Sequence, residues 1–299
     1  MKTYKWLLLS AVIIFLFLFN YFFSIGIRIT PKRQSNVAGT NKLTASSINT
    51  IPNKVITVQP VTKVVLPISW GDFGKRIVAD GVIDKTKFDS VMGSLSDEDK
   101  ALIDGNVENI TMTENNSRLI LNLLWAFGLA NKNAVLDKGE IMQDPTQAGN
   151  YASTGGWTLS KGNAMNYFSK SNYVVLDAEQ QKMVEDMSKN IFRPCCNNST
   201  HFPDCNHGIA MLGLLELMAQ NGVSQEEAYK VALQVNSIWF PQTYQDLAVY
   251  FSENGTSIDK VDPAEVLSAK YSSASGYRQT RSQIKSIPQP AKGSGGCGV

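Results

Sequence analysis

The sequence is poor in cysteine and histidine, with four Cys and two His among its 299 residues. So few cysteines cannot staple a domain of this size, which excludes a small disulfide-rich scaffold. The chain also lacks the G-x-S-x-G motif of serine hydrolases, a glycine-rich phosphate loop with its lysine, the H-E-x-x-H motif and the C-x-x-C-H haem motif. These absences favour a binding protein over an enzyme.

The sequence also has no large excess of positive or negative charge. Five of the 28 basic residues lie within residues 1–33, which contain no acid, so the remaining chain has 23 basic and 26 acidic residues. Nucleic-acid binding needs a basic patch, and this balance provides none, so we expect no nucleic-acid partner. An apolar content of 43% with only 18% charged residues is enough for a sizeable core.

A long apolar run opens the chain. After a short segment, residues 1–5, residues 6–27 read WLLLSAVIIFLFLFNYFFSIGI, 22 residues without a charge. At 1.5 Å per residue, a helix of this length spans the roughly 30 Å core of a bilayer. The run exceeds the apolar core of a secretory signal peptide, and no A-x-A-like cleavage site follows it. It predicts a single-pass signal-anchor in the lipid bilayer, with a cleaved signal peptide as the alternative.

The orientation of this anchor is not decided by its flanking charges. Lys2 and Lys5 precede the apolar run, and Arg28, Lys32 and Arg33 follow it, so the positive-inside rule gives no clear preference. Because a single N-terminal anchor most often exports the long domain behind it, we expect that domain on the extracytoplasmic side of the membrane.

Two segments of low complexity flank the expected domain. Residues 28–64 are rich in Ser, Thr, Asn and Gln without a helical period, which predicts a flexible linker, a disordered tether above the membrane. Residues 272–299 are rich in Ser, Gly, Pro and Gln and predict a flexible C-terminal tail. The domain itself is expected at residues 65–271.

This central part predicts an all-α single domain. Ser96, Ser224 and Asp262 each stand before a helical pattern with an acidic residue three positions later, which is typical of a helix start. No run of alternating strands is present. The clearest helices are expected near residues 119–131, 177–191, 208–221 and 225–238. The first of them is apolar almost all round and predicts a buried central helix.

Five of the six Cys and His residues fall within thirteen positions of the stretch RPCCNNSTHFPDCNHG, residues 193–208. They are Cys195, Cys196, His201, Cys205 and His207. An even distribution would place about 0.3 of these residues in such a window. This Cys/His loop is therefore the strongest indication of function in the sequence.

The residue types in the loop indicate a metal site. The following helix is expected to start at about His207, which places Cys205 at a helix N-terminus, where the dipole favours the thiolate. Thiolates with imidazole suit zinc or copper(I). Only Asp204 adds a carboxylate to the cluster, which argues against calcium and magnesium. We predict the metal ligands Cys195, Cys196, Cys205 and His207, with His201 in reserve, and a partner that exchanges metal or thiols with the site.

Two other interpretations stay open. In a thiol-disulfide oxidoreductase or sulfur carrier, Cys205 attacks and Cys195 or Cys196 resolves the mixed disulfide. In a disulfide-stapled interaction protein, Cys205 and one of the vicinal pair hold the loop closed in an oxidising compartment. The metal content of the purified protein separates the metal-site interpretation from both of these.

Two further residues complete the set of candidates. Cys297 lies near the C-terminus in GSGGCGV, where a flexible arm could carry it to the loop as a mobile ligand or exchange thiol. A terminal cysteine without a role, or one used in an intermolecular disulfide, is an equal alternative. Glu216 stands among apolar neighbours in GLLELMA, where burial without a partner would be costly. We expect it on an exposed helix face, or else beside a histidine as an outer-sphere partner.

Overall fold

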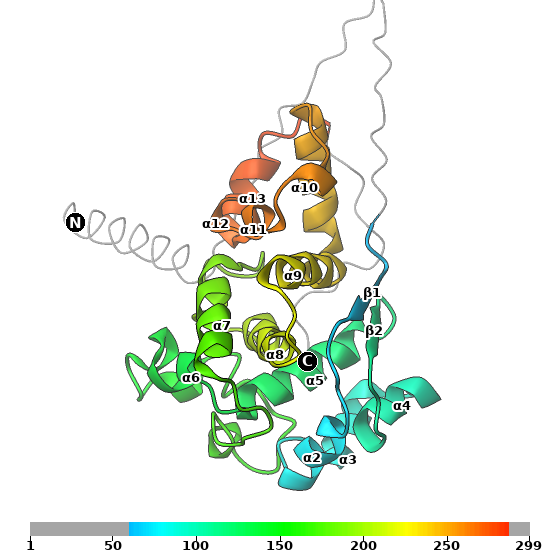
Figure 1. Cartoon of the computed structure of the whole chain (residues 1–299), viewed down its shortest axis with the longest axis vertical. Helices are drawn as coiled ribbons and strands as arrows, with labels where there is room; N and C mark the ends of the chain where they lie inside the picture. The colour runs from blue at the N-terminus through cyan, green and yellow to red at the C-terminus, as the bar shows by residue number, and fades with distance from the viewer. Residues whose placement is uncertain (1–59, 287–299) are drawn as a thin grey trace, which may run out of the picture. The chain divides into compact units, whose positions relative to one another are not determined.

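The computed structural model describes residues 60–286 (Figure 1). The predicted N-terminal segment 1–5, the anchor 6–27, most of the linker 28–64 and Cys297 lie outside the described residues. Within residues 60–286, no helix is both long enough and apolar enough to cross a membrane.

The described residues are mostly helical, as predicted, and they also include one small antiparallel sheet (Figure 1). Strand β1 (Lys63–Leu66) pairs with β2 (Ile110–Thr113), with Lys63 opposite Thr113. Alternate side chains of both strands are buried, so one face of the sheet packs on the core. Strands of four residues are too short to show a reliable alternation in the sequence.

The helices account for most of the remaining chain. In chain order they are α2 (Phe73–Asp80), α3 (Lys85–Met92), α4 (Asp97–Asp104), α5 (Ser117–Ala130), α6 (Ala134–Lys138), η1 (Glu140–Met142), η2 (Ala148–Asn150), η3 (Ala164–Asn166), α7 (Ala178–Asn190), α8 (Asn206–Gln220), α9 (Gln225–Trp239), α10 (Pro241–Glu253), η4 (Ile258–Lys260), α11 (Pro263–Val266), α12 (Ala269–Ser272) and α13 (Ala274–Arg281). The four helices expected near residues 119–131, 177–191, 208–221 and 225–238 correspond to α5, α7, α8 and α9, and are confirmed within two residues at each end.

The predicted helix starts are confirmed by their hydrogen bonds. The Ser96 hydroxyl accepts the Asp99 N–H at 3.1 Å, and the Asp262 carboxylate accepts the Ala264 N–H at 2.9 Å. The Ser224 hydroxyl likewise accepts an amide in the first turn of α9 at 3.3 Å. Each bond satisfies an amide that has no partner within its own helix.

The core is organised around the close crossing of α5 and α8. Residues 119–130 of α5 and residues 206–219 of α8 are all buried, so both helices are covered on every side. Their backbones meet at Gly128 and Gly213. A Cβ added at Gly128 would lie 2.3 Å from the carbonyl oxygen of Ile209, and one at Gly213 would lie 2.9 Å from that of Leu124. Only glycine permits this separation, which supports the predicted central position of α5.

The predicted boundaries of the domain are wrong at both ends. Strand β1 begins at Lys63, within the expected linker, and helix α13 occupies residues 274–281 of the expected flexible tail 272–299. Helix α13 is held mainly by polar contacts, because the fully buried carboxylate of Asp246 accepts a 2.6 Å hydrogen bond from the Tyr277 hydroxyl and pairs with Arg281. Such a helix has no apolar stripe that a sequence pattern could reveal.

The glycine crossing can be tested by adding one methyl group. Gly128→Ala should lower the free energy of unfolding by about 2 kcal/mol or more, because its Cβ must displace the backbone of α8. The measurement is urea unfolding of the full-length chain. Gly149→Ala is the matched control, since a Cβ there meets only the flexible Met165 side chain, at 3.4 Å. Equal stability of the two variants would contradict a backbone contact at the crossing.

Candidate metal centre

The Cys/His loop connects α7 to α8 and is fixed by backbone hydrogen bonds on both sides. The Thr200 N–H donates to the carbonyl of Ile191 at 2.8 Å, and the His201 N–H donates to that of Ser188 at 3.0 Å. On the other side, the first amide of α13, that of Ala274, donates to the Cys196 carbonyl at 2.8 Å. The loop therefore has a defined path between α7, α8 and the C-terminal helices.

This path brings three cysteine sulfurs together, as the sequence predicted. The Sγ atoms of Cys195, Cys196 and Cys205 all lie within 4.8 Å of one another. Cys205 Sγ is 3.6 Å from that of Cys195 and 3.9 Å from that of Cys196. Sulfurs bound to one tetrahedral zinc at about 2.3 Å are about 3.8 Å apart, whereas a disulfide bond is about 2.05 Å long. The three cysteines could hold a metal ion.

Cys205 occupies the predicted helix N-terminus. It is the N-cap of α8, and its sulfur accepts the Gly208 N–H at 3.4 Å. Hydrogen bonds with Cys195 and Cys196, followed by the charge of Arg193, hold the pKa of the Cys205 thiol well below its usual range despite burial. This environment favours the thiolate of Cys205, the form that binds metals.

Cys196 behaves differently. Its hydrogen bond with Cys195 lowers the pKa of the Cys196 thiol, but its hydrogen bond with Cys205 and its burial outweigh this and raise that pKa to about 11. Without an ion, Cys196 thus keeps its proton at neutral pH, and Cys205 ionises more readily than Cys196. A metal ion must displace that proton to bind all three sulfurs.

Arg193 lies against these sulfurs and was missed by the sequence reasoning. Its side chain is completely buried, and its Nη2 atom lies 3.3 Å from each of Cys196 Sγ, Cys205 Sγ and a carboxylate oxygen of Asp204. Burial lowers the pKa of this guanidinium, but its interactions with the cysteines, Cys205 first, raise that pKa above its ordinary value. Arg193 therefore stays charged. In the sequence, only its position close to two cysteines in RPCC indicated that Arg193 could belong to the site.

Gly208 makes room for this guanidinium at the start of α8. A Cβ at Gly208 would lie 2.6 Å from Nη2 of Arg193. A cation is normally unfavourable at a helix N-terminus, because the helix dipole places a partial positive charge there and the two like charges repel. The arrangement is stable only when anions lie between them, and here Cys205 and Asp204 supply these anions.

Neither histidine belongs to the group of possible ligands that the structure brings together. His207 is buried against the rings of Trp239 and Phe240, with ring centroids 5.3 and 4.6 Å away. It stands two residues after the cap Cys205, and two residues turn a helix by about 200°, so the two side chains face opposite ways. His201 lies with Nδ1 3.8 Å from a carboxylate oxygen of Glu140.

Glu216 is buried, which corrects the expectation of an exposed helix face. Its side chain has no exposed surface, and one carboxyl oxygen accepts a hydrogen bond from Asn131 Nδ2 at 2.5 Å. Burial raises the pKa of Glu216 well above its usual range, and the bond from Asn131 lowers it only in part. Because α8 is buried on every side, no face of it was free to expose this residue.

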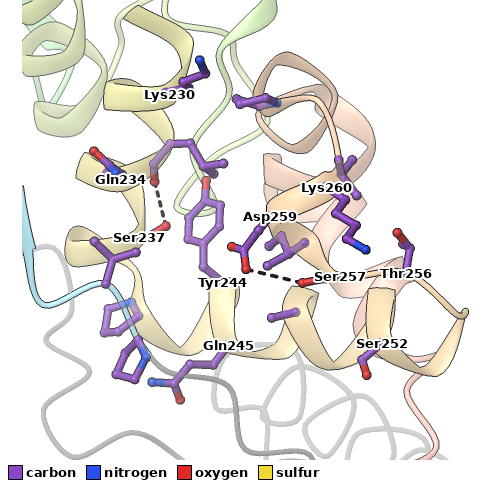
Figure 2. A pocket seen from close by; sticks show the side chains of 18 of the residues that line it. Lys230, Gln234, Ser237, Tyr244, Gln245, Ser252, Thr256, Ser257, Asp259 and Lys260 are labelled. Atoms are coloured by element: carbon purple, nitrogen blue, oxygen red, sulfur yellow. Dashed lines mark hydrogen bonds between the residues drawn. The ribbon is translucent and has the colours of Figure 1, made fainter. Parts of the chain in front are cut away.

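A separate cavity of 1030 Å³ lies between α9, α10 and the chain around η4 (Figure 2). Lys230, Asp259 and Lys260 supply its charged lining, and Tyr244 stands in its wall. The Tyr244 hydroxyl accepts a 3.2 Å hydrogen bond from Asn236 Nδ2, which also donates to the Phe192 carbonyl at 3.0 Å. Phe192 directly precedes Arg193, so Asn236 joins this wall to the backbone at the start of the cysteine loop.

No known protein family, curated protein or solved structure matches this chain. The geometry of the cysteine site is therefore the basis of the proposed function.

The burial of Glu216 has a consequence for stability that pH measures. Below its ordinary pKa of 4.5 the carboxyl is protonated in both folded and unfolded chains. As pH rises above that value, the unfolded chain loses the proton while the folded chain keeps it, so the stability of the folded state falls until its raised pKa is passed. Glu216→Gln removes this dependence, and its melting temperature relative to wild type should increase from pH 5 to pH 9.

The control for this experiment is Glu114→Gln, which removes one carboxylate from the exposed surface. Thermal unfolding of the three full-length proteins at pH 5, 7 and 9 gives the comparison. A melting-temperature difference between Glu216→Gln and wild type that stays constant over this range would show that Glu216 ionises normally in the folded protein.

Proposed function

We propose that this protein binds one thiophilic metal ion through Cys195, Cys196 and Cys205. The observation that carries the proposal is the pair of Sγ separations, 3.6 and 3.9 Å, which lie on either side of the edge length of a metal–thiolate tetrahedron. Two further observations support the same conclusion. The pKa of Cys205 is lowered, and the adjacent Arg193 cation stabilises negative charge on its sulfur before an ion binds.

The donor set favours copper(I) over zinc among the two expected ions. Three thiolates form a soft site, which selects copper(I) or zinc over harder ions. Structural zinc is almost always four-coordinate, and the described residues supply three ligands. Zinc would need a fourth, from water or from Cys297. Cys297 follows Ser286 by eleven positions, and a chain of eleven residues reaches at most about 36–40 Å.

The exposure of the site suits storage or transfer of the ion. Cys195, Cys196 and Cys205 are each half-buried, so a partner's thiols can approach the sulfurs without unfolding the core. Transfer of a metal ion between two sets of thiolates requires an intermediate in which both sets bind the ion. A half-buried site leaves room for the partner's thiolates in that intermediate. The proposed partner is accordingly a protein or small molecule that presents its own soft ligands.

A second candidate function has one observation in its favour. A low-pKa Cys205 with Cys195 Sγ 3.6 Å away resembles a nucleophile with its resolving thiol. In that case Cys205 attacks a disulfide substrate and releases its first thiol. Cys195 then attacks the Cys205 sulfur of the mixed disulfide, which releases the substrate's second thiol and leaves a Cys195–Cys205 disulfide. The disulfide-stapled interaction protein has less support, because these sulfurs are too far apart to be bonded.

We also propose that residues 6–27 anchor the protein in a bilayer with the helical domain on the extracytoplasmic side. The uncharged run of 22 residues supports the anchor. The length of the chain behind this run supports the export of the domain.

Elemental analysis tests the metal site directly. The full-length chain, purified in detergent under reducing and anaerobic conditions, should contain close to one equivalent of copper or zinc. Cys205→Ser should lose it, because a hydroxyl does not replace the central thiolate. The matched control is Cys297→Ser, which should keep one equivalent of copper(I) but bind zinc more weakly if Cys297 is the fourth ligand.

Two results would contradict this assignment. Metal-free wild-type protein that folds normally and contains a Cys205 disulfide by mass spectrometry would favour the staple. Metal-free protein that turns over a disulfide substrate, with loss of turnover in Cys205→Ser, would favour the oxidoreductase.

The membrane topology is tested by fractionation and proteolysis. The full-length protein should stay in the membrane fraction at high salt, because an apolar span is not released by screening charges. Protease added to intact spheroplasts should digest the domain. Complete protection of the domain in spheroplasts, with digestion after lysis, would reverse the proposed orientation.

A further inference from the structure

Arg193 has a position that bears on which ion the cysteines select. Its Nη2 atom is 3.3 Å from Cys196 Sγ and from Cys205 Sγ. A metal–sulfur bond is about 2.3 Å long, so an ion bound by either sulfur lies at most about 5.6 Å from this nitrogen. The side chain is completely buried, and water therefore screens this pair of charges poorly.

The charge on Arg193 is permanent. A guanidinium does not lose its proton in proteins, and the surrounding sulfurs and Asp204 stabilise its charged form. A fixed positive charge repels a divalent ion twice as strongly as a monovalent ion at the same place, because the Coulomb energy is proportional to the charge of the ion. This difference does not depend on how strongly the thiolates bind either metal.

We propose that Arg193 is a selectivity residue, which shifts the three-cysteine site from divalent zinc toward monovalent copper(I). The inference rests on the proposed metal-binding function and adds the charge of the preferred ion to it. At about 5.6 Å and an effective dielectric constant of about 20, one unit of charge changes affinity by about a hundredfold. Arg193 therefore disfavours zinc relative to copper(I) by about that factor.

Asp204 provides an opposite charge in the same place. One of its carboxylate oxygens lies 3.8 Å from Cys196 Sγ and 3.3 Å from Arg193 Nη2. By the same argument it attracts a divalent ion twice as strongly as a monovalent one. Its side chain keeps 21% of its exposure, so solvent weakens the effect, and Arg193 stays dominant.

The test measures the ratio of zinc affinity to copper(I) affinity in the full-length protein. Zinc is titrated against a chromophoric chelator, and copper(I) against bicinchoninate under anaerobic, reducing conditions. The ratio removes effects on the ionisation of Cys195, Cys196 and Cys205, because both metals displace the protons of these three thiols. Arg193→Gln should raise the ratio by about tenfold to a hundredfold, and Asp204→Asn should lower it by about threefold to tenfold.

Two control variants separate charge from packing. Arg193→Lys keeps the charge and should leave the ratio within about threefold of wild type. Arg118→Gln removes an exposed charge in the first turn of α5 and should leave the ratio unchanged. If Arg193→Gln does not fold, the opposite shift in Asp204→Asn still decides the question, because that residue lies at the surface of the loop.

An unchanged ratio in Arg193→Gln, or no shift in Asp204→Asn, with both metals still bound at one equivalent, would overturn the selectivity role and leave the metal site intact. A wild-type protein that binds neither metal would instead refute the metal-binding function itself. The two failures are therefore distinguishable in one set of titrations.

Discussion

A buried arginine is the constraint on which the candidate site depends. The guanidinium of Arg193 has no exposed surface, and an unpaired buried charge would cost several kcal/mol. It must therefore be surrounded by anions or strong acceptors, and the loop supplies Asp204, Cys196 and Cys205 at 3.3 Å each. Because these groups are eleven, three and twelve residues away in sequence, respectively, the chain has to fold back around the arginine. The grouping of the cysteines follows from that path.

The helices on either side fix this loop in place. Helix α8 presents Cys205 at its first turn and is itself fixed by the glycine crossing with α5. Helix α13 donates its first amide to the Cys196 carbonyl. The site is thus built from one of the most buried helices and one of the most polar helices among the described residues. Helix α8 holds Cys205 rigidly, and α13 holds the Cys196 side of the loop through its first amide.

The sequence predicted those parts of the structure whose signals are local. Apolar stripes and cap residues located α5, α7, α8 and α9, and clustering identified Cys195, Cys196 and Cys205. Three features depend on tertiary contacts and were not predictable. The direction of His207 depends on the exact first residue of α8. The burial of Glu216 depends on neighbours covering all of α8. Helix α13 is stabilised by Asp246, a residue that lies 31 positions before Tyr277.

The hydrogen bond from Ala274 to the Cys196 carbonyl joins the cysteine loop to the C-terminal helices. Cys205 caps α8, whereas the Cys196 carbonyl accepts the first amide of α13, so an ion bound to both sulfurs as proposed would fix the attachment point of α13 to the start of α8. Cross-links of this kind remove conformational freedom mainly from partly opened states. In the proposed metal-bound protein, the carbonyl that accepts the first amide of α13 is therefore held in place, which favours the docked position of the C-terminal helices.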